Sequence, residues 1–166
     1  MRRAVIMGVA GSGKSAVGQA LMARLGLRYI DGDDLHPPAN IAKMSAGEPL
    51  SDADRSPWLA DVGRTLAASP ESTAIGCSAL KRAYRDIIRS TAAGPVFFLH
   101  LAAAKAVIAE RMAARAGHFM PLSLLDSQFE ALEPLHPTEL GAVVDINQPL
   151  TAVVEAAARL LQEETG

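Results

Sequence analysis

Residues 8–15 read Gly-Val-Ala-Gly-Ser-Gly-Lys-Ser, and this stretch decides the fold. It matches the pattern G-x-x-x-x-G-K-[ST] in full. The short apolar run 4–7 precedes it, and apolar residues at helical spacing begin at Val17, so the pattern lies between an expected strand and an expected helix. Gly11 and Gly13 let the backbone turn its N–H groups toward phosphate oxygens, and the helix N-terminus adds partial positive charge. The stretch therefore predicts a phosphate-binding loop for a nucleoside triphosphate.

Each residue type in this loop has an expected task. Lys14 is expected to reach the β- and γ-phosphates of ATP, and the Ser15 hydroxyl is expected to bind Mg²⁺. We assign nucleotide binding to Gly8, Ala10, Gly11, Ser12, Gly13, Lys14, Ser15 and Ala16.

Outward from the loop, short apolar runs alternate with helical patterns. Strands are expected at 4–7, 27–30, 73–77, 95–101 and 142–146. Residues 35–68 have little strand character and are expected to form helices with turns at Pro49 and Pro57, and helices are also expected near 80–88, 104–115 and 150–161. This alternation predicts an α/β fold, a parallel sheet covered by helices on both faces, whose ligands bind at the carboxyl ends of the strands.

Composition limits the possible classes of protein. The 166 residues fit a single domain, 1–166, and the net charge of −2 gives no sign of a broad nucleic-acid surface. No apolar run is long enough to span a bilayer, and the first residues do not form a secretory signal. The single cysteine, Cys77, permits no intrachain disulfide. We expect a cytoplasmic protein.

Phosphate-binding loops serve GTPase switches, motor ATPases and kinases alike. The N-K-x-D and D-x-x-G motifs of GTPases are absent, and the expected third strand ends in Gly76-Cys77-Ser78 without the acidic pair of a motor ATPase. A small kinase fits better. It needs an acceptor site, a base for the acceptor hydroxyl and cations near the γ-phosphate.

Two carboxylates follow the expected second strand. Asp31 and Asp33 would point the same way if the strand continued through them, and the parallel sheet would place them beside the phosphate-binding loop. One carboxylate can hold Mg²⁺ through water and the other can accept the proton of the attacking hydroxyl. We assign Asp31 to the metal and Asp33 to the base, although the sequence alone permits the reverse.

Beyond the loop, the chain resembles the gluconate kinase family from its first strand to its last helix. The specific part of the resemblance lies in two blocks, 31–59 and 77–86. The matching runs are Asp31-Gly-Asp-Asp-Leu-His-Pro37, Asn40, Lys43-Met44, Gly47-Glu-Pro-Leu50, Asp54-Arg55, Pro57-Trp58-Leu59, Cys77-Ser-Ala-Leu-Lys-Arg82, Tyr84-Arg85-Asp86, Gly117-His-Phe119, Gln128-Phe-Glu130, Leu132-Glu133, Val144-Asp145 and Gln148-Pro149-Leu150.

The resemblance implies transfer of the ATP γ-phosphate to the 6-hydroxyl of D-gluconate. It also implies a nucleoside-monophosphate-kinase-like fold with a five-stranded parallel sheet, a helical acceptor-binding insert at about 35–68 and a lid at about 115–124. Members of the family are often dimers, so we expect a homodimer. Two alternatives stay open: a kinase for another small acid or nucleotide, such as a shikimate-like acceptor, and a non-catalytic nucleotide-binding module.

Gluconate carries a carboxylate, so its site needs cations and hydrogen-bonding groups. The expected acceptor contacts, besides Asp33, are His36, Arg55, Lys81, Arg85 and His118. Lys81 and Arg85 are four residues apart and are expected to share a helix face. Arg111 and Arg115 resemble lid arginines that close over the phosphates, and with Lys14 and Asp33 they complete the expected catalytic set.

Overall fold

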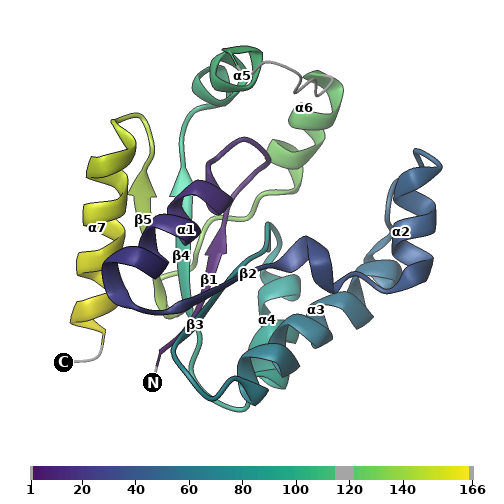
Figure 1. The fold of residues 1–166 in the computed structure, drawn as a ribbon. Coiled ribbons are helices and arrows are strands. Elements are labelled where there is room, and N and C mark those ends of the chain that lie inside the picture. The colour runs from purple at the N-terminus through teal and green to yellow at the C-terminus, as the bar shows by residue number, and fades with distance from the viewer. Residues whose placement is uncertain (1, 115–121, 165–166) are drawn as a thin grey trace.

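A parallel five-stranded sheet forms the centre of the computed structural model, which describes residues 2–114 and 122–164 (Figure 1). The strand order is β2-β3-β1-β4-β5, and each neighbouring pair is parallel. The sequence prediction of the strands and of the fold class is confirmed. The strands are β1 (Arg3–Met7), β2 (Arg28–Asp31), β3 (Thr73–Gly76), β4 (Phe97–Ala102) and β5 (Gly141–Asp145).

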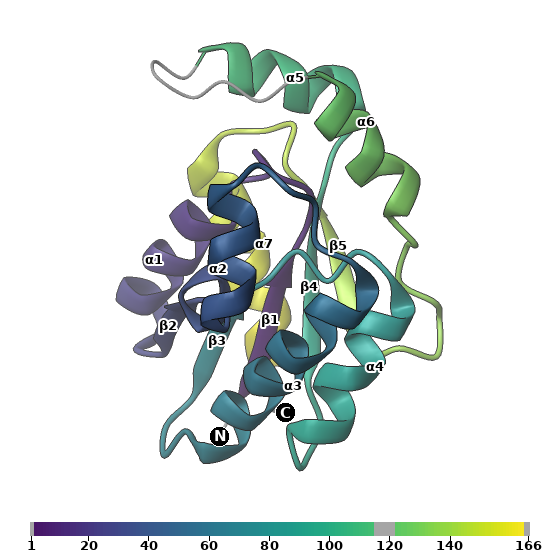
Figure 2. The ribbon, with the colours of Figure 1, turned by 90° about the vertical axis from the view of Figure 1, so that its right-hand side faces the viewer.

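Helices cover both faces of this sheet (Figures 1 and 2). Side chains alternate along a strand, so Ala4 and Ile6 of β1 join one apolar cluster while Val5 and Met7 join the other. The helices α1 (Lys14–Leu25) and α7 (Leu150–Glu163) contribute to the first cluster. The helices α3 (Asp52–Ala68) and α4 (Arg82–Thr91) contribute to the second.

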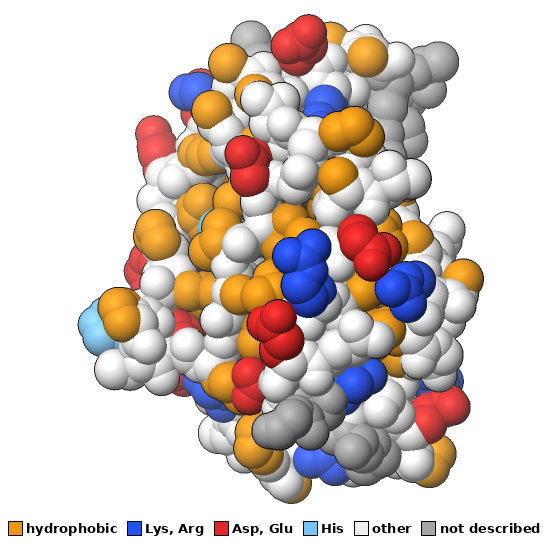
Figure 3. Space-filling view, turned by 90° about the vertical axis from the view of Figure 1, so that its left-hand side faces the viewer, with side chains coloured by type: hydrophobic (Ala, Val, Ile, Leu, Met, Phe, Trp, Pro, Cys, Tyr) orange, Lys and Arg blue, Asp and Glu red, His pale blue; other side chains and the backbone are white. Residues whose placement is uncertain are grey.

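On the face of α1 and α7, exposed charges of both signs are interspersed with apolar side chains (Figure 3). Arg24 of α1 and Glu155 of α7 form an exposed ion pair at 3.1 Å. Among the residues that the structure describes, no helix has the length and apolar character needed to cross a membrane.

Helix α3 begins at a reciprocal cap and continues through a proline. The Ser51 side chain accepts from the Asp54 amide at 3.1 Å, while the Asp54 carboxylate accepts from the Ser51 amide at 2.9 Å. The predicted turn at Pro57 is wrong, because Pro57 lies inside this helix. Proline at this position removes one helical hydrogen bond. The cap and the buried stripe that includes Leu59 and Val62 offset that loss.

The remaining helices lie around the carboxyl edge of the sheet. The 3₁₀ helix η1 (Gly32–Leu35) and α2 (Pro38–Ser45) follow β2, and α2 projects from the body (Figure 1). The expected insert thus contains α2 and α3. The helices α5 (Lys105–Ala114) and α6 (Leu122–Ala131) lie above the sheet edge (Figure 1). Most of the expected lid, residues 115–121, lies outside the described residues.

A buried ion pair joins α4 to the segment before β5. The Arg85 side chain is fully buried, and its guanidinium donates to both carboxylate oxygens of Glu139, at 2.7 and 3.0 Å. It also donates to the carbonyls of Ala79 and Leu80, at 2.9 and 3.2 Å. Burial alone would raise the pKa of Glu139, but the hydrogen bonds from Arg85 and neighbouring groups lower it to about 2. Removing either partner of such a buried, fully hydrogen-bonded ion pair strongly destabilises the folded protein, because it leaves the other charge without a counter-ion.

We therefore expect Glu139→Gln to destabilise the protein by about 3–5 kcal/mol at neutral pH, because it leaves the Arg85 charge buried without its counter-ion. Since the folded-state pKa of Glu139 lies below its ordinary value of 4.5, its contribution is present above pH 4.5 and is lost as the pH falls toward 2. Chemical unfolding of the wild type and of Glu139→Gln, measured from neutral pH down toward pH 2, should show the difference in their unfolding free energies shrinking. The control is Glu130→Gln, which makes the same change at an exposed position on α6. A loss of stability in Glu139→Gln that does not depend on pH would contradict the role given to the Glu139 carboxylate.

Candidate active site

A cavity of about 290 Å³ opens at the carboxyl edge of the sheet, where the phosphate-binding loop, the end of β2 and the end of β3 meet. Its walls include several of the residues that the sequence assigned to the nucleotide, together with both candidate carboxylates. The lining residues are Ala10, Gly11, Gly13, Lys14, Ser15, Ala16, Tyr29, Asp31, Asp33, Gly76, Cys77, Ser78 and Gln128. Gly8 and Ser12 belong to the same loop but are not among the lining residues.

The loop requires glycine at two of these positions. Gly11 and Gly13 have φ angles of 79° and 91°, a region that other residues rarely adopt. A Cβ atom on Gly11 would also lie 2.7 Å from the Met112 side chain of α5. The Ser12 hydroxyl is buried and has no hydrogen-bond partner among the described residues. A curled loop with an unpaired buried hydroxyl suits the binding of phosphate oxygens.

Lys14 lies folded back on its own loop. Its Nζ donates to the carbonyls of Gly8 and Val9, at 2.9 and 3.1 Å. Burial lowers the pKa of Lys14, while nearby Cys77 and the Asp33 and Asp31 carboxylates act in the opposite direction. The ammonium group thus lies between the loop and the acidic side of the cavity.

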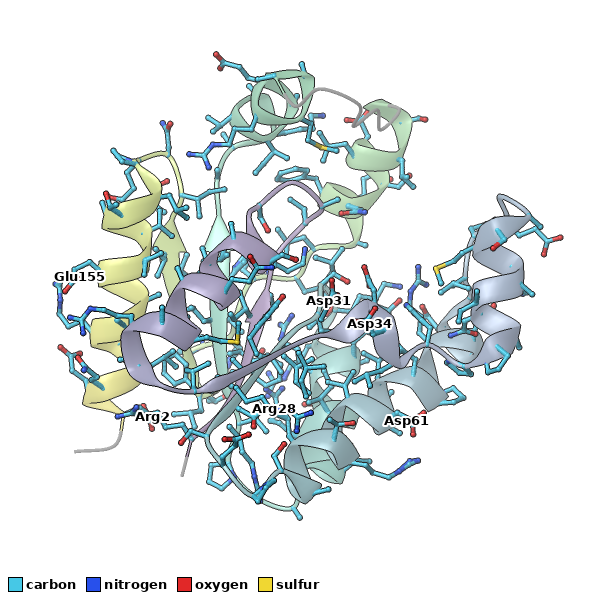
Figure 4. All side chains as sticks on the ribbon, in the orientation of Figure 1. Arg2, Arg28, Asp31, Asp34, Asp61 and Glu155 are labelled. Carbon is cyan, nitrogen blue, oxygen red and sulfur yellow. The ribbon has the colours of Figure 1, made fainter. Side chains whose placement is uncertain are left out.

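The chain turns between the two carboxylates, so they do not alternate along one strand. β2 ends at Asp31, whose Oδ1 accepts from the Asp33 amide at 3.0 Å and so begins η1. Both side chains nevertheless line the cavity. Asp31 ends β2 and Asp34 lies in η1, and both are labelled in Figure 4. Desolvation by the surrounding protein, followed by the Asp31 carboxylate, raises the pKa of Asp33, while His36 and Lys14 oppose this change.

Several lining residues were assigned no role from the sequence, and two of them, Gln128 and Tyr29, bring large side chains to the cavity wall. Gln128 of α6 accepts from the Ala10 amide through its Oε1 at 2.7 Å, and so joins α6 to the phosphate-binding loop. Burial raises the pKa of Tyr29, while the neighbouring Ser15 side chain lowers it. The Tyr29 side chain packs so closely on α1 and β3 that a Cβ on Gly18 would lie 2.2 Å from a ring carbon, and a Cβ on Gly76 would lie 2.2 Å from the hydroxyl oxygen. Period-two alternation from Asp31 could have indicated Tyr29.

Two of the expected acceptor cations come together at the start of α3 and α4. Arg55 and Lys81 both lie over the Tyr84 ring, 5.7 and 5.5 Å from its centroid. Both also face the Asp52 carboxylate, at 3.8 and 3.5 Å. The Tyr84 hydroxyl donates to Asp52 as well. This group of two cations, one carboxylate and one phenol is suited to holding an organic anion through charge-assisted hydrogen bonds.

Arg85 does not join this group. The predicted common helix face of Lys81 and Arg85 is wrong, because Lys81 is the N-cap residue of α4 while Arg85 turns inward to Glu139. Complete burial in that ion pair removes Arg85 from the surface that an acceptor could reach. Its conspicuous place in the sequence motif is explained by the structural ion pair described above.

The expected lid residues are only partly described. Arg111 of α5 donates to the carbonyls of Ile146 and Gln148, on the connection between β5 and α7. It is not among the residues that line the cavity. Arg115 and His118 lie outside the described residues.

His36 is buried beside Asp33. Its ring stacks on Trp58 with centroids 4.1 Å apart and an interplanar angle of 18°. Its Nε2 lies 4.0 Å from Asp33 Oδ1. Trp58 is itself buried in the core and donates from Nε1 to the Gly32 carbonyl at 2.8 Å. Burial lowers the pKa of His36, Asp33 raises it, and Arg55 lowers it further.

Cys77 lies at the cavity wall, but its thiol is unreactive. Burial raises the pKa of its thiol to about 12, so the nucleophilic thiolate is scarce at neutral pH. The reactive groups of the cavity are therefore the ammonium of Lys14, the hydroxyl of Ser15 and the carboxylates of Asp31 and Asp33. The last three present oxygen donors of the kind that Mg²⁺ prefers.

Comparison with known proteins agrees with this site. A family described as an AAA domain matches residues 4–135. The thermosensitive gluconokinase of Escherichia coli (strain K12) is 49% identical over 155 residues, covering 91% of this chain and 82% of that protein. The crystal structure of a gluconokinase from Sinorhizobium meliloti 1021 is also 49% identical, with a TM-score of 0.90, and covers 98% of this chain and 93% of that one.

The crystal structure of shikimate kinase from Aquifex aeolicus vf5 has a TM-score of 0.60 at 18% identity, covering 98% of each chain, and this likeness shows the fold alone. Sequence identity near one half over nearly the whole chain is a far more specific relation. The chain belongs to the gluconokinase family of P-loop kinases.

Proposed function

We propose that this protein is a gluconokinase, which transfers the γ-phosphate of ATP to the 6-hydroxyl of D-gluconate and releases 6-phospho-D-gluconate and ADP. The observation that carries the proposal is the cavity in which Lys14 and Ser15 of the phosphate-binding loop face the carboxylates Asp31 and Asp33. The family relation supports gluconate as the acceptor.

The phosphate-binding loop orients the nucleotide. Its N–H groups and the start of α1 bind the phosphate oxygens. The Lys14 ammonium exchanges its present carbonyl partners for the β- and γ-phosphates, where it stabilises the charge that spreads over the transferring group. Ser15 and Asp31 would hold Mg²⁺, which neutralises phosphate charge when it is bound.

The acceptor approaches from the side of α3 and α4. Arg55 and Lys81 bind the gluconate carboxylate, in place of part of their present interaction with Asp52. The far end of the sugar acid then extends toward Asp33. Asp33 orients the 6-hydroxyl and takes its proton as the phosphoryl group transfers. The raised pKa of Asp33 makes it a better proton acceptor than an ordinary aspartate.

The acceptor can be tested directly by measuring ADP release with Mg-ATP and a panel of gluconate, shikimate, AMP and related sugar acids. We expect strong stimulation by gluconate, because the cationic pair at Arg55 and Lys81 suits its carboxylate. Turnover with a different acceptor, and not with gluconate, would support a kinase activity but contradict gluconate as the acceptor. ATP binding without any stimulated release would favour a non-catalytic nucleotide-binding module.

The base can be tested with Asp33→Asn, which keeps the size of the side chain but cannot accept the proton. We expect kcat to fall by about 100-fold or more, with ATP affinity retained. The matched control is Asp34→Asn, since Asp34 is exposed, lies next in the chain and is not a lining residue of the cavity. A kcat near that of the wild type in Asp33→Asn would contradict the assignment.

A further inference from the structure

His36 is held in one orientation by two neighbours. One face of its ring stacks on Trp58, which is itself anchored by its hydrogen bond to the Gly32 carbonyl. Its Nδ1 lies 3.2 Å from the Nδ2 of Asn40, a residue that is only 3% exposed. The stack fixes the plane of the ring, and the contact with Asn40 fixes which edge of the ring faces α2.

The partners of Asn40 determine which ring nitrogen carries the proton. Asn40 Nδ2 also donates to the Asp54 carbonyl at 3.0 Å, and a carbonyl oxygen can only accept. The amide nitrogen must therefore face both Asp54 and His36. Because an amide nitrogen carries only hydrogens, Nδ1 of His36 must be the acceptor, and a neutral imidazole then carries its hydrogen on Nε2.

That Nε2 lies on the side of Asp33, 4.0 Å from its Oδ1. The distance exceeds a hydrogen bond, but the Asp33 side chain is open to solvent and can rotate to close it. Catalytic hydrogen bonds commonly tighten when substrates bind. The arrangement is thus a chain of contacts from the Asp54 carbonyl through Asn40 and His36 to Asp33.

We propose that His36 is a positioning residue: its Nε2–H, fixed by Asn40, donates to one oxygen of Asp33 and turns the other oxygen toward the acceptor hydroxyl. This inference rests on the proposed role of Asp33 as the base. His36 thus orients Asp33 instead of contacting the acceptor directly. Asn40 contributes by fixing the tautomer of His36.

The tautomer is measurable without any substrate. The sequence contains four histidines, and in a ¹⁵N-histidine spectrum the signals missing from His36→Gln identify His36. We expect an unprotonated Nδ1 and a protonated Nε2 near neutral pH. The opposite tautomer would overturn the inference, whatever the acceptor of the enzyme is.

Kinetics then separate positioning from packing and from acceptor binding. His36→Phe keeps an aromatic ring on Trp58 but has no donor, whereas His36→Gln keeps an N–H close to the position of Nε2. We expect His36→Phe to lower kcat about 10- to 100-fold with a smaller change in the KM for gluconate, and His36→Gln to restore most of kcat. Thermal unfolding of both variants shows whether the core is intact.

Three kinetic outcomes would overturn the inference: an unchanged kcat in His36→Phe, equal losses in both variants, or a raised KM for gluconate with kcat retained. The last would mean that His36 contacts the acceptor. Normal turnover of gluconate by Asp33→Asn would show that Asp33 is not the base. This result is distinguishable from one that contradicts only the role of His36.

A double-mutant cycle tests the part played by Asn40. In Asn40→Leu no donor faces Nδ1, so the hydrogen is no longer confined to Nε2 and kcat should fall in the wild-type background. In the His36→Gln background no imidazole is present, and the same substitution should have little further effect. Equal effects in both backgrounds would show that Asn40 acts independently of His36 and would overturn this step.

Discussion

The position of β3 between β1 and β2 is the constraint on which the active site depends. It places the ends of three strands side by side, so that the phosphate-binding loop, Asp31 and the residues after Gly76 share one cavity. The fit is close: a Cβ atom on Gly32 would lie 2.3 Å from the Gly76 carbonyl oxygen. Any larger residue there would separate β2 from β3 and move the carboxylates away from the loop.

Within this cavity, burial and charge act against each other. Burial lowers the pKa of Lys14, and the nearby carboxylates restore part of it. Desolvation and the neighbouring Asp31 raise the pKa of Asp33, and Lys14 and His36 limit that rise. Each group therefore depends on its neighbours for its protonation state, which is typical of sites that bind and transfer charged groups.

The fold could be predicted from the sequence because its signals are local. The loop motif and the buried runs of the strands each involve a few adjacent residues. The turn predicted at Pro57 was wrong, because the cap at Ser51 and the tertiary packing of α3 outweigh the one helical hydrogen bond that proline removes.

The site was predicted less completely, because its remaining features depend on contacts distant in sequence. Arg85 and Lys81 have the same charge in one motif, yet a partner 54 residues away draws Arg85 into the interior. Gln128 contacts Ala10 across 118 residues, and no local pattern indicates that bond. The tautomer of His36 likewise follows from Asn40 and the distant Asp54 carbonyl together.

The central claim is that one end of the acceptor binds at Arg55 and Lys81 while the other reaches Asp33. A crystal structure with gluconate, Mg²⁺ and a non-hydrolysable ATP analogue tests it most directly. The account predicts the gluconate carboxylate on Arg55 and Lys81, with the 6-hydroxyl within hydrogen-bond distance of Asp33 and facing the γ-phosphate. A 6-hydroxyl held by another group, or a carboxylate bound away from both cations, would contradict it.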